Sequence, residues 1–175
     1  MEHKLHLYYG NGKGKTTAGM GLAVRFLGHG KKVLIAQFMK DGTSGELAAL
    51  KHFPNVKVFD IEPFKGFFAQ MTPDEQQKAI ASQTQEAQRL QEAICHLHPD
   101  MILLDELAIA CVVGIVPQNV AESLVAAAVQ YGETVVTGYD APDWLKEQAN
   151  YVTHLTAEKH PFETEGLSAR KCVEW

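Results

Sequence analysis

Short apolar segments alternate with amphipathic segments along most of the chain. Six runs rich in β-branched and aromatic residues predict strands: LHLYY at 5–9, VLIAQF at 33–38, VKVFDI at 56–61, MILLD at 101–105, TVVTGY at 134–139 and YVTHLT at 151–156. Runs this short and this apolar are typical of a parallel sheet that is covered on both faces.

Helical patterns lie between these runs. The clearest helix begins after Thr72, which can cap it, with Pro73 at its first position and Glu75 completing a capping box. It should end at His98, because the following Pro99 is incompatible with a helix interior. Shorter helices are predicted over 18–27, 117–131 and 142–150.

Strands separated by helices imply right-handed crossovers and a doubly wound α/β fold with a mostly parallel sheet. We expect a single domain of the P-loop nucleotide-binding type over residues 1–175, in which 157–175 form a C-terminal tail able to cover the site. Ligands of such folds bind at the carboxyl ends of the strands.

Composition narrows the class of protein. The chain has 175 residues, 46% of them hydrophobic, and a net charge of -5, which suits one globular core and not a basic coat for nucleic acid. Neither a membrane span of ~18 apolar residues nor a signal sequence is evident, so a cytoplasmic protein is expected. Three cysteines without CxxC spacing predict reduced thiols, and eight histidines without HExxH spacing do not predict a metal cage.

A glycine-rich loop follows the first strand and opens a helix, as a phosphate-binding loop does. Glycines let backbone N–H groups turn toward phosphate, Lys15 supplies positive charge, and Thr16 is placed to bind Mg²⁺. Tyr9 stands where the usual motif has its first glycine, so the loop is effectively one residue short. A simple glycine-rich turn is the alternative. The expected phosphate-binding residues are Gly10, Asn11, Gly12, Lys13, Gly14, Lys15, Thr16 and Thr17.

A second motif is the apolar strand MILLD, which ends in two carboxylates. Asp105 would lie beside the loop and hold a metal directly or through water, because Mg²⁺ prefers oxygen ligands. Glu106 could orient an attacking water, bind the metal or bind a ribose hydroxyl. The alternative is that both residues only cap the next helix.

The two motifs predict binding of a nucleoside triphosphate without deciding the reaction. No N/T-K-x-D guanine motif is present, which favours ATP over GTP. The chain has only three arginines, Arg25, Arg89 and Arg170. This small number argues against a kinase, because kinases usually place several arginines around the transferred phosphoryl group.

Several segments, in the same order, resemble the P-loop type of ATP:corrinoid adenosyltransferases, which convert cob(I)alamin to adenosylcobalamin. They are GNGKGKTT, LGHGKKV, QFMK, LLDEL, VVTG and the tail EKHPFETEGLSARKCVEW. The resemblance implies that Co(I) of a corrinoid attacks C5′ of ATP and expels triphosphate, with ATP bound in the reverse sense from most P-loop enzymes. It also implies Mg²⁺ or Mn²⁺, a homodimer and a reducing flavoprotein. Nucleic acid and membranes are not expected as partners, because the chain is mildly acidic and contains no long apolar span.

The resemblance further implies roles for individual residues. Lys15, Thr16 and Glu106 are expected to be catalytic, and Thr16, Asp105 and Glu106 to hold the metal. Outside the loop, the residues expected to bind ATP or the corrinoid are Lys40, Phe67, Phe68, Lys159, His160 and Arg170. A solvated surface lysine is the alternative for Lys40, and a tail covering a sheet edge is the alternative for 159–162. For Phe67 and Phe68 the alternative is local packing.

Two departures from the family pattern keep other functions open. The segment before the long helix reads GFFAQMT, where the family commonly has an aromatic G-F-T-W-x-T segment, and Tyr139 follows Gly138 where an arginine is often found. The alternatives are therefore a non-catalytic or regulatory ATP-binding protein of the same fold, or a small ATPase or kinase.

Overall fold

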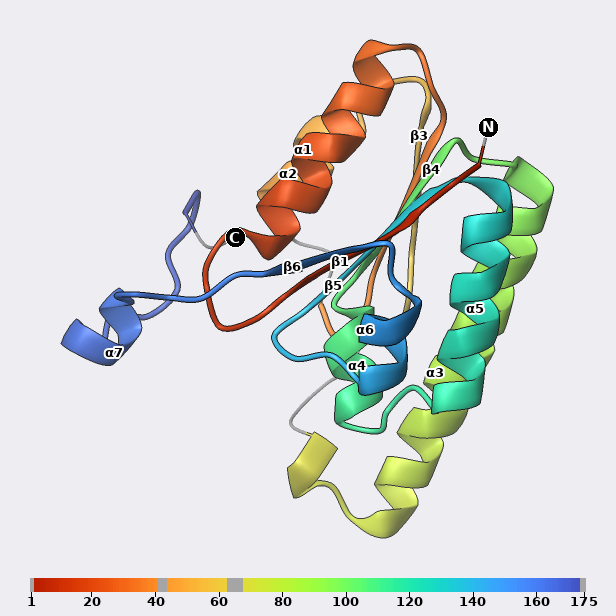
Figure 1. Ribbon diagram of the computed structural model, residues 1–175. Coiled ribbons are helices and arrows are strands. Elements are labelled where there is room, and N and C mark those ends of the chain that lie inside the picture. The colour runs from red at the N-terminus through yellow and green to blue at the C-terminus, as the bar shows by residue number, and fades with distance from the viewer. Residues whose placement is uncertain (1, 41–43, 63–67, 174–175) are drawn as a thin grey trace.

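The computed structural model describes residues 2–40, 44–62 and 68–173. Within them, six strands form one parallel sheet in the order β3-β2-β4-β5-β1-β6 (Figure 1). The strands are β1 (Leu5–Tyr9), β2 (Val33–Gln37), β3 (Val56–Phe59), β4 (Met101–Asp105), β5 (Glu133–Gly138) and β6 (Tyr151–His154). The predicted doubly wound α/β class is confirmed.

Helices cover both faces of the sheet. Helices α1 (Lys15–Gly28) and α2 (Gly45–Leu50) lie on one face, and α3 (Pro73–Leu97), α4 (Leu107–Val112), α5 (Gln118–Tyr131) and α6 (Asp143–Gln148) lie on the other (Figure 1). A short 3₁₀ turn (Phe68–Gln70) precedes α3, and α7 (Pro161–Glu165) lies in the tail.

The sheet divides the core into two layers because successive side chains of a strand point to opposite faces. In β4, Met101 and Leu103 pack with α1 in the smaller core layer, whereas Ile102 and Leu104 pack with α3, α4 and α5 in the larger core layer. Every residue of β2 and β4 is buried, which explains why these central strands read as continuous apolar runs.

The predicted elements match the structure closely, and for α3 the predicted N-cap residue and capping box are also confirmed. The Thr72 hydroxyl accepts a hydrogen bond from the Glu75 amide, and the Glu75 carboxylate accepts one from the Thr72 amide. The predicted strands at 33–38, 56–61, 134–139 and 151–156 each end one or two residues earlier in the structure. Helices α2 and α7 were not predicted, because six and five residues are too few for helical periodicity to emerge.

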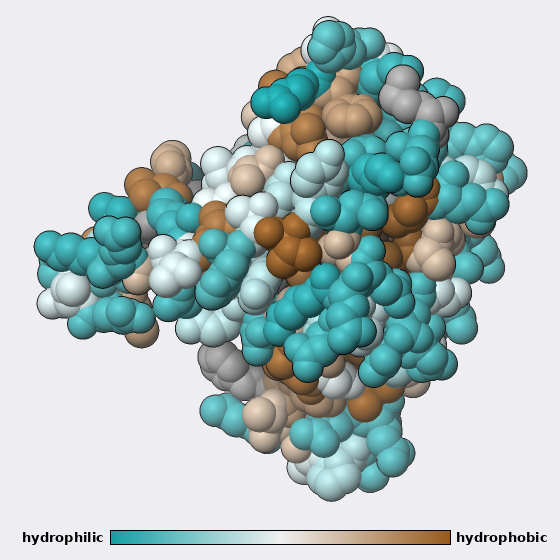
Figure 2. Space-filling view, in the orientation of Figure 1, coloured by the Kyte–Doolittle hydropathy of each residue, from teal (hydrophilic) through white to brown (hydrophobic). Residues whose placement is uncertain are grey.

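The C-terminal segment is different from the rest of the chain. All four residues of the edge strand β6 are exposed, and residues 161–173 are exposed throughout. Figure 2 shows the tail as a mostly hydrophilic arm that projects from the body at the left. No helix among the described residues has the length and apolar character to cross a membrane.

Shortening a side chain in the centre of β4 should strongly destabilise the fold. Leu104 is fully buried between the sheet and the helices of the larger layer. We expect Leu104→Ala to lower the free energy of unfolding in urea by about 2–5 kcal/mol, because it leaves a cavity. The control Val24→Ala, at a side chain 49% exposed on α1, should change it by no more than about 0.5 kcal/mol. Equal effects of the two variants would contradict the assigned core.

Candidate active site

The glycine-rich loop joins the carboxyl end of β1 to α1 and packs against the segment that follows β6. The Gly12 amide donates a hydrogen bond to the Leu155 carbonyl over 2.8 Å. A Cβ atom on Gly12 would lie 2.8 Å from the Leu155 carbonyl carbon, and one on Gly10 would collide with the Leu155 oxygen. Gly10 also has a φ of 121°, which favours glycine. The segment that follows β6 therefore lies so close to the loop that only glycine fits at positions 10 and 12.

The loop ends at the N-terminus of α1, where the first backbone amides have no partner within the helix. Gly14 is the N-cap residue, and it has no side chain with which to cap them. Lys15, Thr16 and Thr17 form the first turn of this 14-residue helix. The amides of this turn and the helix dipole together suit an anion such as phosphate.

Lys15 is held at the mouth of the loop. Its Nζ donates a hydrogen bond to the Gly12 carbonyl over 2.9 Å and lies 5.9 Å from the centroid of the Tyr139 ring. Burial lowers the pKa of Lys15, and the neighbouring Glu106 carboxylate opposes that shift. An anion bound at the loop would give this half-buried ammonium a partner of opposite charge.

Asp105, at the carboxyl end of β4, lies at the centre of the site and has no solvent exposure. One carboxylate oxygen, Oδ1, accepts hydrogen bonds from the hydroxyls of Thr16 (2.9 Å) and Thr137 (2.6 Å). The other, Oδ2, accepts from the Gln37 amide (2.9 Å) and the Lys40 ammonium (2.6 Å). The carboxylate thus joins α1, β2, β5 and the segment after β2.

Lys40 is part of this cluster and not a solvated surface lysine. Besides Asp105, its Nζ donates to the Thr16 hydroxyl over 3.1 Å, and its side chain is 29% exposed. The preceding Met39 has a φ of 54°, a left-handed conformation that is uncommon outside glycine. That turn brings Lys40 back over the end of the sheet.

Glu106 also has a left-handed backbone, with a φ of 62°, and occupies the N-cap position of α4 without a side-chain capping bond. Its amide donates to the Thr137 hydroxyl over 2.9 Å. Burial raises the pKa of the Glu106 carboxyl, and the nearby Asp105 charge adds to the shift. The Asp105 carboxylate bonds four side chains instead of capping α4, whereas Glu106 occupies the N-cap position without a side-chain capping bond.

A cavity of ≈ 390 Å³ opens beside the loop. Its lining combines loop residues and apolar side chains with polar groups: Tyr9, Gly10, Asn11, Ile109, Val112, Tyr139, Asp140, His154 and Thr156. Of these, Tyr139 is 61% exposed. A flat or apolar ligand group can therefore lie next to phosphates bound at the loop.

Cys111 offers no thiolate nucleophile at this site. Cys95, Cys111 and Cys172 are free thiols in the structure. Cys111 belongs to α4, and burial raises its pKa to about 12, so it stays protonated at neutral pH.

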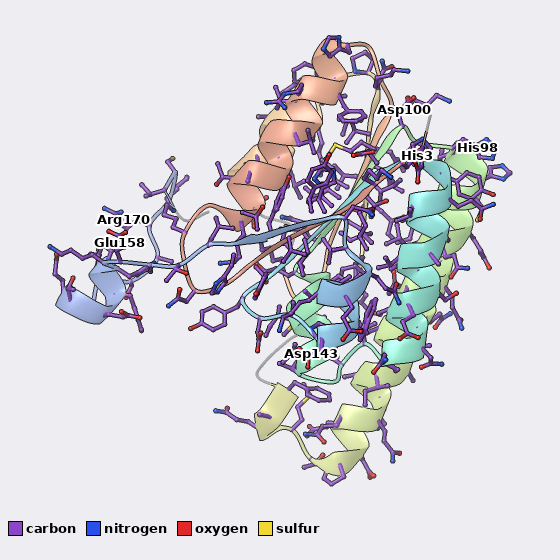
Figure 3. The ribbon with its side chains drawn as sticks, viewed as in Figure 1. His3, His98, Asp100, Asp143, Glu158 and Arg170 are labelled. Carbon is purple, nitrogen blue, oxygen red and sulfur yellow. The ribbon has the colours of Figure 1, made fainter. Side chains whose placement is uncertain are left out.

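Among the described residues, Phe68, Lys159, His160 and Arg170 are not gathered at the Asp105 cluster (Figure 3). Phe67 lies outside the described residues, and Phe68 packs against the larger core layer. Lys159 is exposed in the tail, and His160 accepts a hydrogen bond from the Phe162 amide at the start of α7. Figure 3 places Arg170 in the same projecting tail, with Glu158.

Contacts between the tail and the loop are made by other residues. Lys13 Nζ donates to the Val173 carbonyl, and the Asn11 side chain accepts from the Ala157 amide over 3.0 Å. The chain near Val173 therefore returns to the loop although α7 projects away from the body (Figure 1).

Sequence reasoning missed two partners of Asp105. Gln37 is a buried amide at the end of an apolar strand, and Thr137 is a buried hydroxyl one residue before Gly138. A polar side chain near the carboxyl end of a central parallel strand was the available signal, because these ends meet at one edge of the sheet.

Comparison with known proteins agrees with this geometry. A family described as "ATP:corrinoid adenosyltransferase BtuR/CobO/CobP" matches residues 2–175. A corrinoid adenosyltransferase of Pseudomonas aeruginosa is 35% identical over 177 aligned positions, covering 98% of this chain and 83% of the relative.

Two further relatives cover similar spans. A corrinoid adenosyltransferase of Escherichia coli is 30% identical, with 97% of this chain and 84% of the relative covered. The corrinoid adenosyltransferase CobA of Salmonella typhimurium is 29% identical over the same shares. The chain belongs to the ATP:corrinoid adenosyltransferase family.

Proposed function

We propose that this protein transfers the 5′-deoxyadenosyl group of ATP to the reduced cobalt of a corrinoid. The Co(I) electron pair forms a bond to C5′, the C5′–O bond breaks, and its electrons leave with triphosphate, so cobalt becomes formally Co(III). The observation that carries the proposal is a phosphate loop joined through Thr16 to the buried Asp105 in a chain of this family.

In this reaction the phosphates are the leaving group, so the protein must bind them and stabilise the charge that develops on them. The first-turn amides of α1 and the Lys15 ammonium are the groups suited to this task. Held in place before the reaction, they need no rearrangement as charge builds up.

The donor set also fits a divalent cation. Thr16 Oγ1 and Asp105 Oδ2 both contact one positive group already, the Lys40 ammonium, at 3.1 and 2.6 Å. We assign Thr16 and Asp105, with Glu106, to Mg²⁺ or Mn²⁺, which takes one or two carboxylates together with substrate phosphates. When bound there, the cation would neutralise charge on the triphosphate.

For the corrinoid we propose the apolar side of the cavity next to the loop. Ile109, Val112 and Tyr139 offer aliphatic and aromatic surface there, and Phe67 and Phe68 remain candidates for a wall that excludes water. We assign the tail residues Lys159, His160 and Arg170 to closing the site over ATP. We further propose that the protein is a homodimer, that a flavoprotein reduces the corrinoid, and that the reaction takes place in the cytoplasm.

The reaction can be tested directly with Mg-ATP and chemically reduced cobalamin. We expect a light-sensitive alkyl cobalamin and one triphosphate per product, resolved by absorbance and ion exchange. ADP and orthophosphate without alkylation would favour an ATPase or kinase. ATP binding without any turnover would favour a regulatory protein.

Loss of the Lys15 ammonium should weaken ATP binding. Hydrogen bonds to charged groups contribute about 1.5–3 kcal/mol, so Lys15→Ala should raise the dissociation constant of ATP roughly ten- to a hundredfold. The control Lys31→Ala removes a lysine paired with Asp100, outside the Asp105 cluster. Calorimetry should show unchanged ATP affinity for the control. Unchanged affinity for Lys15→Ala would remove this lysine from the phosphate site.

A variant without the carboxylate charge separates metal binding from ribose binding, two of the three roles considered for Glu106. If Glu106 binds the metal, Glu106→Gln should weaken Mn²⁺ binding to the ATP complex by about tenfold, equivalent to about 1.4 kcal/mol. It should leave the preference for ATP over 2′-deoxy-ATP unchanged. Unchanged Mn²⁺ affinity with a lost preference would assign Glu106 to the ribose instead.

A further inference from the structure

Lys40 lies at the position where the proposed metal would be bound. We propose that its ammonium is the resident cation of the nucleotide-free site, and that a divalent ion arriving with ATP displaces it. The inference rests on the metal site of the proposed function and does not depend on the corrinoid.

The contacts of Lys40 are those expected of a metal at this site. Its Nζ lies 2.6 Å from Asp105 Oδ2 and 3.1 Å from Thr16 Oγ1. The hydroxyl hydrogen of Thr16 is directed to Asp105 Oδ1, which leaves an oxygen lone pair toward Lys40. Two oxygens from α1 and β4 thus converge on one positive charge.

Asp105 needs this charge because it has no solvent exposure. A buried carboxylate is strongly destabilising without a partner of opposite charge. Its other donors, Gln37, Thr16 and Thr137, are neutral. Lys15, the other nearby ammonium, instead bonds the Gly12 carbonyl. Lys40 is therefore the cationic group bonded to Asp105 among the described residues.

The backbone holds Lys40 in this position. Strand β2 ends at Gln37, whose side chain bonds Asp105, and Met39 then adopts a φ of 54°. Non-glycine residues keep such a conformation only where the surrounding structure enforces it. Met39 packs against the larger core layer, so the turn is anchored on the side opposite Lys40's contacts.

An ammonium in the metal position should oppose metal binding in the absence of ATP. A divalent ion would have to break the ion pair with Asp105 and would meet Lys40 as a like charge at short range. Phosphate oxygens change the balance, because they add ligands to the metal and offer Lys40 a new partner. The site would then take up metal with ATP and not before it.

Removing the ammonium should therefore create a metal site in the bare protein. Without nucleotide, Lys40→Met should bind Mn²⁺ at least about tenfold more tightly than the unmodified protein, measured by electron paramagnetic resonance. Lys40→Gln, which keeps a hydrogen-bond donor without charge, should behave alike. Lys40→Arg, which keeps the charge, should bind Mn²⁺ as weakly as the unmodified protein.

The matched control is Lys31→Met, which breaks another lysine–aspartate pair, with a 3.2 Å separation from Asp100, on an exposed surface. Its Mn²⁺ affinity should be unchanged. In thermal unfolding, Lys40→Met in EDTA should have a lower unfolding temperature than the unmodified protein. Mg²⁺ should raise the unfolding temperature of the variant back to that of the unmodified protein, whose own unfolding temperature should not respond to Mg²⁺.

Two results would overturn the proposal. One is an Mn²⁺ affinity of both neutral variants equal to that of the unmodified protein. The other is a loss of folding in both variants that Mn²⁺ does not reverse. Folding that depends on Mn²⁺ would support the proposal. Because these measurements contain neither ATP nor corrinoid, a failure of adenosyl transfer would leave their outcome unaffected.

Discussion

The site depends on one buried carboxylate. Asp105 has no contact with solvent, and four side chains from different parts of the chain satisfy its two oxygens. Removal of such a group would leave several buried donors unpaired, and removal of its cationic partner would leave a buried charge. The position of Thr16 relative to the sheet, and hence that of the loop, follows from this cluster.

The same constraint explains why the loop and the carboxylate at the end of β4 form one unit although 89 residues separate Thr16 from Asp105. The sheet order places β5 between β4 and β1, and Thr137 of β5 bonds both Asp105 and the Glu106 amide. The ends of the neighbouring strands β4 and β5 are thereby joined beside the glycine-rich loop. A leaving triphosphate would meet groups that are already oriented.

Much of this arrangement could be predicted from the sequence, because its signals are local. The strand MILLD, the capping box at Thr72 and the loop before Lys15 each carry their own pattern, and the structure contains all three. Contacts between distant segments had no such pattern. The pairing of Lys40 with Asp105 follows a left-handed turn at Met39. The loop needs glycine at positions 10 and 12 because Leu155, more than 140 residues away in the chain, packs against them. The short helices α2 and α7 carry too little periodicity to be recognised.

We propose that the Asp105 cluster exchanges the Lys40 ammonium for a metal ion when ATP binds, and that the neighbouring cavity exposes C5′ to the corrinoid. A crystal structure of the Mg-ATP complex tests this most directly. We expect Mg²⁺ on Thr16 and on Asp105, directly or through water, the Lys40 ammonium moved onto phosphate, and C5′ facing the cavity bounded by Tyr139. Lys40 still paired with Asp105, or C5′ buried beneath the loop, would contradict the account.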